Sequence, residues 1–301
     1  MRPGPFTYLT VAAAAAGIVF ILLPLFIMAA TAFNPTAITF PPEGFTLKWF
    51  GAVLEDARFV RAIIISLVLA VFSAAVSSAI GLIVALAIRQ SKSRIAEHLS
   101  TLMLSPLFIP GALLGIALYQ GANALFGTVP LGVLLVGHIL LTLPFPVRAL
   151  MAGLARIPTS LEEAAFLSGA GFLGTVWHVL LPQLRLHLFA GSAMAFTMSW
   201  NDFDLSLFLS GTRVQTLPVE IYGRLQLGAD PSITALSLIV ALVSVAGVII
   251  LDRTIGVAEF AGMERQGPRR TPGGRQRSAP STPSTPSTPS HPQPDSGVLT
   301  P

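Results

Sequence analysis

The segment at residues 169–174, GAGFLG, has the spacing G-x-G-x-x-G with which dinucleotide-binding proteins wrap a pyrophosphate. That chemistry needs a strand before the first glycine and a helix that opens at the last one. The preceding residues, TSLEEAAFLS, instead contain the capping box S/T-x-x-E at 159–163, which predicts a helix start. Gly169 then follows that helix, where it is expected as a left-handed C-cap. A nucleotide site is therefore disfavoured, and the chain also lacks the phosphate loop G-x-x-x-x-G-K-S/T, since its lysines are Lys48 and Lys92.

Two carboxylates, Asp202 and Asp204, lie near the end of an otherwise apolar region. Acids inside a membrane are costly and mark substrate or ion pathways. On a regular helix these two would point about 200° apart, so both could not face one pore. Asn201 would share a face with Asp204, and Ser199 would share the other face with Asp202. A cationic substrate favours Asp202 at the pathway, and the alternative is that both acids lie at the headgroup level without a specific role.

Metal and cofactor chemistry finds little support in the sequence. There is no cysteine, so neither a disulfide nor a cysteine-based metal site is available. His138 lies in an apolar segment with no second ligand spaced to join it. The sequence therefore predicts no metal, no cofactor and no catalytic residue.

The elements that carry these side chains are predicted to be membrane helices. Hydrophobic residues make up 53% of the 301 residues and charged residues 11%, against about 25% charged residues in a soluble domain. A helix needs about 20 apolar residues to cross the hydrocarbon core. The sequence thus predicts an all-α integral membrane protein with six transmembrane helices. Their approximate ranges are 9–33, 62–88, 99–121, 128–147, 186–209 and 232–251.

Local composition adds detail to these helices. Small residues between Ser73 and Gly81 favour close packing of the second helix. Pro106 and Pro110 predict a kink in the third. The first apolar run has 25 residues without a charge, longer than the 7–15 of a signal-peptide core, so a retained helix is favoured over a cleaved signal.

The distribution of basic residues predicts the orientation. With the N-terminus inside, cytoplasmic segments hold 13 of the 18 Lys and Arg residues and outer segments hold 5, so both termini are expected in the cytoplasm. Basic residues confined to loops and a tail do not form a nucleic-acid surface. Residues 1–263 are expected to form the membrane domain. Residues 264–301, with RQGPRR and STPSTPSTPS, are expected to be a disordered cytoplasmic tail, either touching anionic lipid or without a specific role.

A cytoplasmic loop is expected at about 148–185, between the fourth and fifth helices. It is long for a connector, and long loops tend to be functional. Its pattern predicts a short helix, a glycine turn and a second helix that ends near Leu181-Pro182. Such a hairpin is either a docking element or an amphipathic helix resting on the bilayer.

This loop resembles the EAA loop of importer-type ABC transporter permeases, whose pattern is E-A-A-x3-G-x9-I-x-L-P. The residues that match are Glu163, Ala164, Ala165, Gly169, Val179, Leu181 and Pro182, with Val179 in place of isoleucine. The resemblance covers nearly the whole chain, including residues 45–70. Residues 196–224 are most similar to the spermidine/putrescine permeases, the second permease of the pair in particular.

The resemblance implies a permease subunit in the bacterial cytoplasmic membrane without an ATP site of its own. Its expected partners are two cytoplasmic ABC ATPase subunits, a second permease in a heterodimer, an extracytoplasmic solute-binding protein and the lipid bilayer. The loop would sit in a cleft of the ATPase. Glu163 would be its polar anchor, Ala164 and Ala165 would allow close approach, Gly169 would make the turn, and Leu181-Pro182 would end the second helix of the hairpin.

The resemblance points to a polyamine as substrate, although those relatives tend to have two adjacent acids where this chain has Asn201 and Asp202. Aminoethylphosphonate, an opine, ferric iron or a sugar remain alternatives. A stand-alone secondary carrier is the alternative of another class, but no two halves of the sequence match as its repeats should. A membrane enzyme would need a nucleophile and base, and no such constellation is found.

Overall fold

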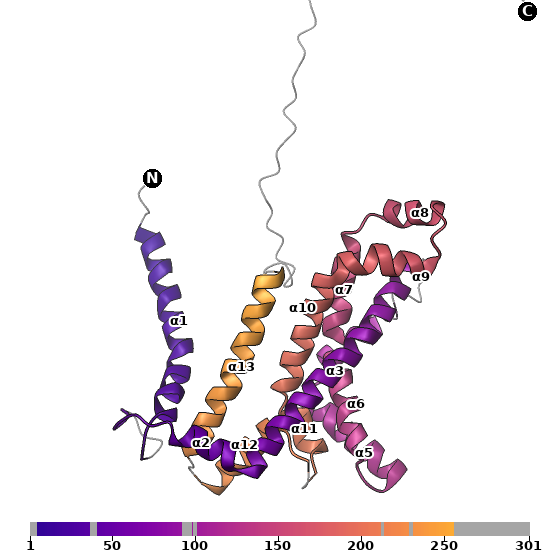
Figure 1. Cartoon of the computed structure of the whole chain (residues 1–301). Coiled ribbons are helices and arrows are strands. Elements are labelled where there is room, and N and C mark those ends of the chain that lie inside the picture. Colours follow the sequence, from indigo (N-terminus) through magenta and orange to yellow (C-terminus); the bar gives the residue numbers. More distant parts are fainter. Residues whose placement is uncertain are drawn as a thin grey trace, which may run out of the picture. The chain divides into compact units, whose positions relative to one another are not determined.

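The computed structural model describes residues 5–36, 41–91, 98, 101–211, 214–228 and 231–255, which are almost entirely helical (Figure 1). The predicted tail, 264–301, lies outside the described residues. Within the described part, five helical runs are long and apolar enough to cross a membrane, and a bent pair of helices forms a sixth candidate. The predicted all-α membrane protein is confirmed.

Three of the spans are single helices. They are α1 (Pro5–Ala32), α3 (Ala57–Gln90) and α13 (Pro231–Ile255). Two spans are composite: α6 (Leu131–Thr142) with α7 (Pro144–Ala155), and α9 (Phe172–Thr175) with the π-helix η2 (Val176–Leu180) and α10 (Leu181–Trp200). The bent pair is 101–108, ending in the 3-10 helix η1 (Ser105–Phe108), and α5 (Gly111–Phe126), which meet at 105°. Four shorter helices lie in the part of the chain that the structure describes: α2 (Lys48–Glu55), α8 (Thr159–Leu167), α11 (Asp204–Leu209) and α12 (Leu217–Leu227).

The third and fourth spans differ from their predicted ends. The predicted kink between Pro106 and Pro110 is present, but α5 continues past 121 to Gly127, where a φ of 67° ends the helix with a left-handed cap. The fourth span continues beyond 147 to Ala155. It does so because its prolines stand in the first turn of α7, where no backbone N–H is required of them.

The fifth span is shifted along the chain. It was predicted at 186–209, but it starts at Phe172 and ends at Trp200. Pro182 does not separate the hairpin from this span, because η2 directly precedes it and the proline stands at the start of α10. After Trp200 the chain leaves helical geometry for three residues before α11 begins, so Asp202 lies between helices and not on one.

The bundle is organised around α3, which packs against α10 and α7. The predicted small face of α3 is buried at Ser73, Ala74, Ser77, Ser78 and Gly81. A closer approach occurs between α10 and α7, where a Cβ added at Gly191 would lie 2.6 Å from the Cα of Pro146. Small residues also join α3 to α10, where the hydroxyls of Ser78 and Ser192 form a hydrogen bond of 2.7 Å.

The two ends of α3 carry different neighbours (Figure 1). At its start, the Asp56 carboxylate binds the guanidinium of Arg224 on α12 at 2.5 Å, and the same guanidinium lies 4.3 Å from the ring centroid of Phe59. At its end, Arg89 binds Glu162 on α8. The short helix α12 and the hairpin that begins with α8 therefore lie at opposite ends of a 34-residue helix.

Candidate functional site

A pocket of about 380 Å³ lies where three helix breaks meet. One wall is the bend between η1 and α5, another is the α6–α7 junction, and the third is the break between α10 and α11. The lining residues are Pro106, Leu107, Ile109, Gly111, Leu141, Phe145, Met198, Asn201, Asp202, Phe203 and Asp204. All three pathway candidates predicted from the sequence, Asn201, Asp202 and Asp204, are thus brought to one cavity.

The helix break explains why both carboxylates reach the same pocket. A regular helix would have pointed Asp202 and Asp204 apart, but the chain turns between Trp200 and the start of α11. Gly111, another lining residue, packs beside both acids: a Cβ added there would lie 3.3 Å from the Cβ of Asp204 and 3.9 Å from Oδ1 of Asp202. The condition of a regular helix is not met, so both acids line one pocket.

The three polar side chains of the pocket are held differently. Only 7% of the Asp202 side chain is exposed, and its Oδ2 accepts hydrogen bonds of 2.9 Å from both the backbone N–H and the hydroxyl of Ser206. Asn201 donates to the Thr197 carbonyl at 2.8 Å and accepts from Ser244 on α13. Asp204 is exposed. Asp202 is therefore the carboxylate with a fixed orientation.

His138 belongs to this site, which the sequence did not predict. Its imidazole is fully buried, with Nδ1 2.7 Å from the hydroxyl of Ser199 and Nε2 3.0 Å from that of Ser206. Nε2 also lies 3.7 Å from Oδ2 of Asp202. The partners come from α10 and α11, so spacing along α6 could not reveal them. One signal in the sequence could have indicated these partners. A lone imidazole in an apolar span costs free energy unless it has a polar partner, so such a partner was to be expected.

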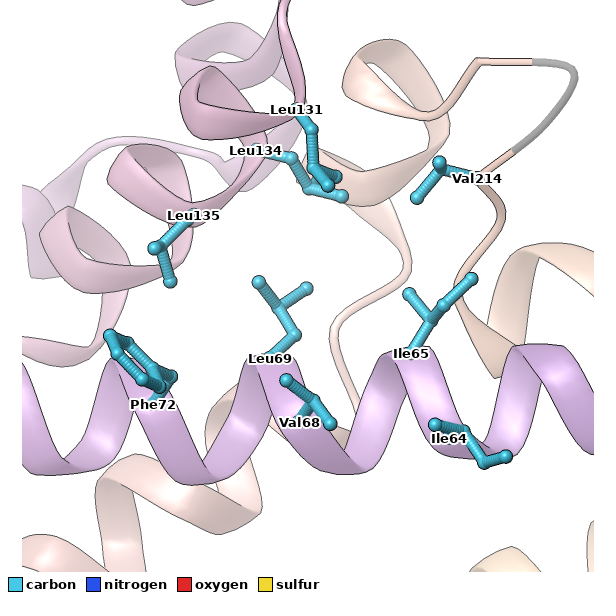
Figure 2. A pocket seen from close by; sticks show the side chains of 9 residues that line it. All are labelled: Ile64, Ile65, Val68, Leu69, Phe72, Leu131, Leu134, Leu135 and Val214. Carbon is cyan, nitrogen blue, oxygen red and sulfur yellow. The ribbon is translucent and has the colours of Figure 1, made fainter.

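No metal centre accompanies this network within the described residues, where no group of three or more His, Asp or Glu side chains could hold an ion. A second cavity, of about 360 Å³, lies between α3 and α6 (Figure 2). Figure 2 shows Ile65 and Leu69 of α3 turned toward Leu134 of α6 and toward Val214. All nine labelled side chains are aliphatic or aromatic, so this cavity has no group that could orient a charged solute.

The hairpin at the other end of α3 has the predicted glycine turn. Gly169 follows α8 with a φ of 85°. Its N–H donates to the carbonyl of Phe166, and the N–H of Ala170 donates to that of Ala165, both at 3.0 Å. This pair of bonds is a Schellman motif, in which a left-handed residue closes a helix end. The expectation of a left-handed C-cap at Gly169 is confirmed.

The predicted capping box is wrong. Pro158 precedes α8 and no side chain caps its N-terminus. Glu162 instead turns to α3, where its Oε1 accepts a hydrogen bond of 2.6 Å from Nε of Arg89. The same guanidinium donates to the carbonyls of Leu154 and, at 2.8 Å, Ile157. Arg89 thereby joins the end of α7, the start of α8 and the end of α3. Glu162 forms this long-range contact in place of a local cap on α8.

The other hairpin residues predicted from the sequence differ in exposure. Glu163 and Ala164 are exposed and Ala165 is half-buried. Within the described residues no ion pair forms at Glu163. Val179 and Leu181 are half-buried and Pro182 is exposed. The hairpin also exposes four large apolar side chains: Phe166, Leu167, Leu173 and Trp177.

The sequence of the chain is similar to known membrane proteins. The model of a family described as "Binding-protein-dependent transport system inner membrane component" matches residues 77–257, which include the pocket carboxylates and the hairpin. The chain is 28% identical over 230 residues to the spermidine/putrescine transport system permease protein PotC of Escherichia coli strain K12, covering 76% of this chain and 87% of PotC. It is 27% identical over 251 residues to the putative 2-aminoethylphosphonate transport system permease protein PhnV of Salmonella choleraesuis strain SC-B67, covering 82% and 92%.

The fold is also similar to a solved structure. A chain in the crystal structure of a bacterial ABC transporter involved in the import of the acidic polysaccharide alginate aligns with a TM-score of 0.65. The alignment covers 82% of this chain and 94% of that one, at 16% sequence identity. At this level of identity the likeness concerns the fold alone.

Proposed function

This chain belongs to the binding-protein-dependent transport system inner membrane component family of ABC importer permeases, and we propose that it moves a small organic amine past Asp202. The observation that carries the proposal is the Asp202 carboxylate in the pocket wall, with 7% of its side chain exposed. A carboxylate inside a membrane bundle is costly unless a counter-charge reaches it. An ammonium group of the substrate supplies that charge, whereas a neutral sugar does not.

The charges around the pocket favour a cation. Its polar side chains are two carboxylates and one amide, and no Lys, Arg or His is among the lining residues. Spermidine and putrescine, which the name of PotC gives as its substrates, carry ammonium groups and no anionic group. Two carboxylates attract such molecules electrostatically. A polyamine is therefore the proposed substrate.

Aminoethylphosphonate is the second candidate, and the similarity to PhnV favours it. This molecule also carries an amine, which Asp202 would bind. Its phosphonate is an anion, however, and Asp204 lines the same pocket as Asp202. Repulsion by the carboxylates makes the aminophosphonate a poorer fit to the site than a polyamine.

The hairpin is proposed to couple the chain to ATP hydrolysis by separate subunits. The hairpin exposes both large apolar side chains and Glu163, an acid with no ion pair among the described residues, and such a surface is suited to docking. Glu163, as an exposed carboxylate, is the proposed acceptor of charge-assisted hydrogen bonds from an ATPase subunit. Arg89 links this surface to α3, which packs against α10, so a displaced hairpin pulls on helices that lead to the pocket.

The proposed assembly contains this chain, a second permease as the other half of a heterodimer, two ATPase subunits on the cytoplasmic side and a solute-binding protein outside. Both termini and the hairpin lie on the cytoplasmic side, in accordance with the basic residues of the connecting segments. The alternative of another class, a stand-alone secondary carrier, would transport without an ATPase.

The test is uptake by the complete transporter in proteoliposomes, with ATP inside and substrate-loaded binding protein outside. Asp202→Asn is expected to lower putrescine uptake about tenfold or more, because the fixed counter-charge is lost. Asp204→Asn is expected to have a smaller effect, since this acid is exposed. Uptake that survives Asp202→Asn refutes the amine site. Uptake by this chain without ATPase subunits refutes the importer and favours the carrier.

A further inference from the structure

A chain of buried polar side chains leads from the middle of α3 to the pocket carboxylate. Ser73 on α3 donates to Ser199 on α10 at 3.0 Å, and Ser199 lies 2.7 Å from Nδ1 of His138 on α6. Nε2 of His138 lies 3.0 Å from Ser206 on α11, and Ser206 donates to Oδ2 of Asp202 at 2.9 Å. The network thus connects four helices, α3, α10, α6 and α11, with the carboxylate.

The inventory of protons gives this network a direction. The hydroxyl of Ser206 has one proton and gives it to Asp202, so it must accept from His138. Nε2 therefore carries the imidazole proton, and Nδ1 accepts from Ser199. Ser199 in turn accepts from Ser73. The single proton of Ser73 is shared, because its hydroxyl also donates to the Ala70 carbonyl at 3.2 Å. From Ser199 onward, every hydrogen bond of the network points toward Asp202 with this tautomer.

This arrangement fixes one carboxylate oxygen and leaves the other toward the pocket. Oδ2 of Asp202 accepts from the N–H and the hydroxyl of Ser206 and lies 3.7 Å from Nε2 of His138. The imidazole is fully buried, so it fills the space behind the carboxylate into which Asp202 could otherwise turn. Oδ1 lies beside Gly111, another lining residue of the pocket.

We propose that His138 is a positioning residue for the substrate-binding carboxylate: it holds Ser206, which holds Oδ2 of Asp202, so that Oδ1 faces an incoming ammonium group. The inference rests on the proposed role of Asp202 in binding an amine. His138 does not touch the substrate in this arrangement, because it is absent from the pocket wall. His138 affects substrate binding only through the orientation of the Asp202 carboxylate, since a carboxylate that turns away from the pocket binds an ammonium group less well.

The test compares two amide substitutions in the complete reconstituted transporter. The amide nitrogen of glutamine can reach the place of Nε2 and donate to Ser206, whereas asparagine reaches only the place of Nδ1. Putrescine uptake is expected to fall at least fivefold in His138→Asn and to stay within twofold of wild type in His138→Gln. A role in packing alone would also make asparagine the worse replacement, because it leaves the larger cavity, so the comparison is completed by a cycle with Asp202 that separates the two roles.

A double-mutant cycle shows whether His138 acts through Asp202. In an Asp202→Asn background, His138→Asn is expected to lower uptake no further, because there is no carboxylate left to position. Where uptake by Asp202→Asn is below detection, Asp202→Glu replaces that background, because its longer side chain moves the carboxylate one methylene away from the place where Ser206 holds it. Ser78→Ala is the matched control, because it removes the hydrogen bond to Ser192 between α3 and α10 without touching the network, and it should leave uptake within twofold of wild type.

The outcomes separate this inference from the proposed function. Full uptake by Asp202→Asn overturns the amine site and the positioning role together. If Asp202→Asn lowers uptake but His138→Asn does not, or if the two effects multiply, the amine site stands and the positioning role is wrong. Should His138→Asn fail to assemble, Ser206→Ala takes its place in the cycle, and the same non-additivity is required of it.

Discussion

The guanidinium of Arg89, in the last turn of α3, donates a hydrogen bond of 2.6 Å to the carboxylate of Glu162 in α8. The two residues are 73 positions apart in the sequence. The side chains are 13% and 15% exposed. The same guanidinium also binds two backbone carbonyls at the end of the fourth span. One side chain thus attaches the hairpin to the helix around which the bundle is organised.

Arg89→Ala is expected to detach α8 and to destabilise the permease by about 2 kcal/mol, because three charge-assisted contacts are lost and Glu162 is left unpaired. Glu162→Gln removes only the charge of one partner and should cost less. The measurement is thermal unfolding of the purified complex together with ATP-coupled uptake. Equal stability of Arg89→Ala and wild type would contradict the anchoring role.

The two adjacent glutamates of α8 are expected to give opposite phenotypes. Glu163 is exposed and forms no ion pair within the described residues, so Glu163→Ala should change the free energy of unfolding by less than the roughly 0.5 kcal/mol typical of surface substitutions. If Glu163 docks to the ATPase as proposed, the same variant should lose ATPase stimulation by the loaded binding protein. Glu162→Gln is the control. A Glu163→Ala variant with normal coupling would argue that the hairpin docks by its apolar side chains alone.

Features with a local cause could be predicted from the sequence. Charge-free runs predict the spans because a helix needs about 20 apolar residues to cross the hydrocarbon core. Gly169 predicts a left-handed turn because glycine adopts that conformation more readily than other residues. The matching pattern of the loop also identified the family. These signals need no knowledge of distant contacts.

Features that depend on distant partners could not be predicted. Glu162 stands at the position of a capping residue in the sequence pattern, but its carboxylate binds Arg89 of another helix instead. His138 is isolated along α6 and finds its hydroxyl partners on α10 and α11. The break after Trp200 has no proline or glycine to announce it, so the regular helix placed Asp202 and Asp204 on opposite faces.

Acid is expected to weaken the contact between Asp56 and Arg224 at the start of α3. Burial acts to raise the pKa of Asp56, but the hydrogen bond from Arg224, the backbone N–H of Arg58 and the Arg224 charge outweigh it and hold the pKa below 3.8. A pKa lowered by folding gives stability that is complete above the unfolded value and is lost as the pH falls through the folded value.

The corresponding experiment measures the unfolding temperature of the detergent-solubilised protein from pH 7 to pH 3. Asp56→Asn should cost about 1 kcal/mol at pH 7, as expected for a pair with side chains 23% and 28% exposed. The difference between wild type and variant should shrink below pH 3.8. A difference that stays constant over this range would mean that the Asp56 charge contributes nothing to the contact.

The turn at Gly169 offers a comparison between two glycines two residues apart. Gly169 has a φ of 85°, whereas Gly171 has a φ of −72°, which any residue adopts. A Cβ at either position would have no neighbour within 4 Å, so alanine meets no steric obstacle and only the backbone conformation differs. Gly169→Ala is therefore expected to cost about 1 kcal/mol and Gly171→Ala close to nothing.

This backbone strain should act on the hairpin and not on the bundle. Gly169→Ala is expected to speed hydrogen exchange of the amides of Gly169 and Ala170, whose bonds close α8, and to lower ATP-coupled uptake. Gly169→Asn should show slower hydrogen exchange and higher uptake than Gly169→Ala, because asparagine tolerates the left-handed region better than alanine. If Gly169→Ala and Gly171→Ala reduced uptake equally, the hairpin would not require the left-handed turn. It would instead require small residues at both positions.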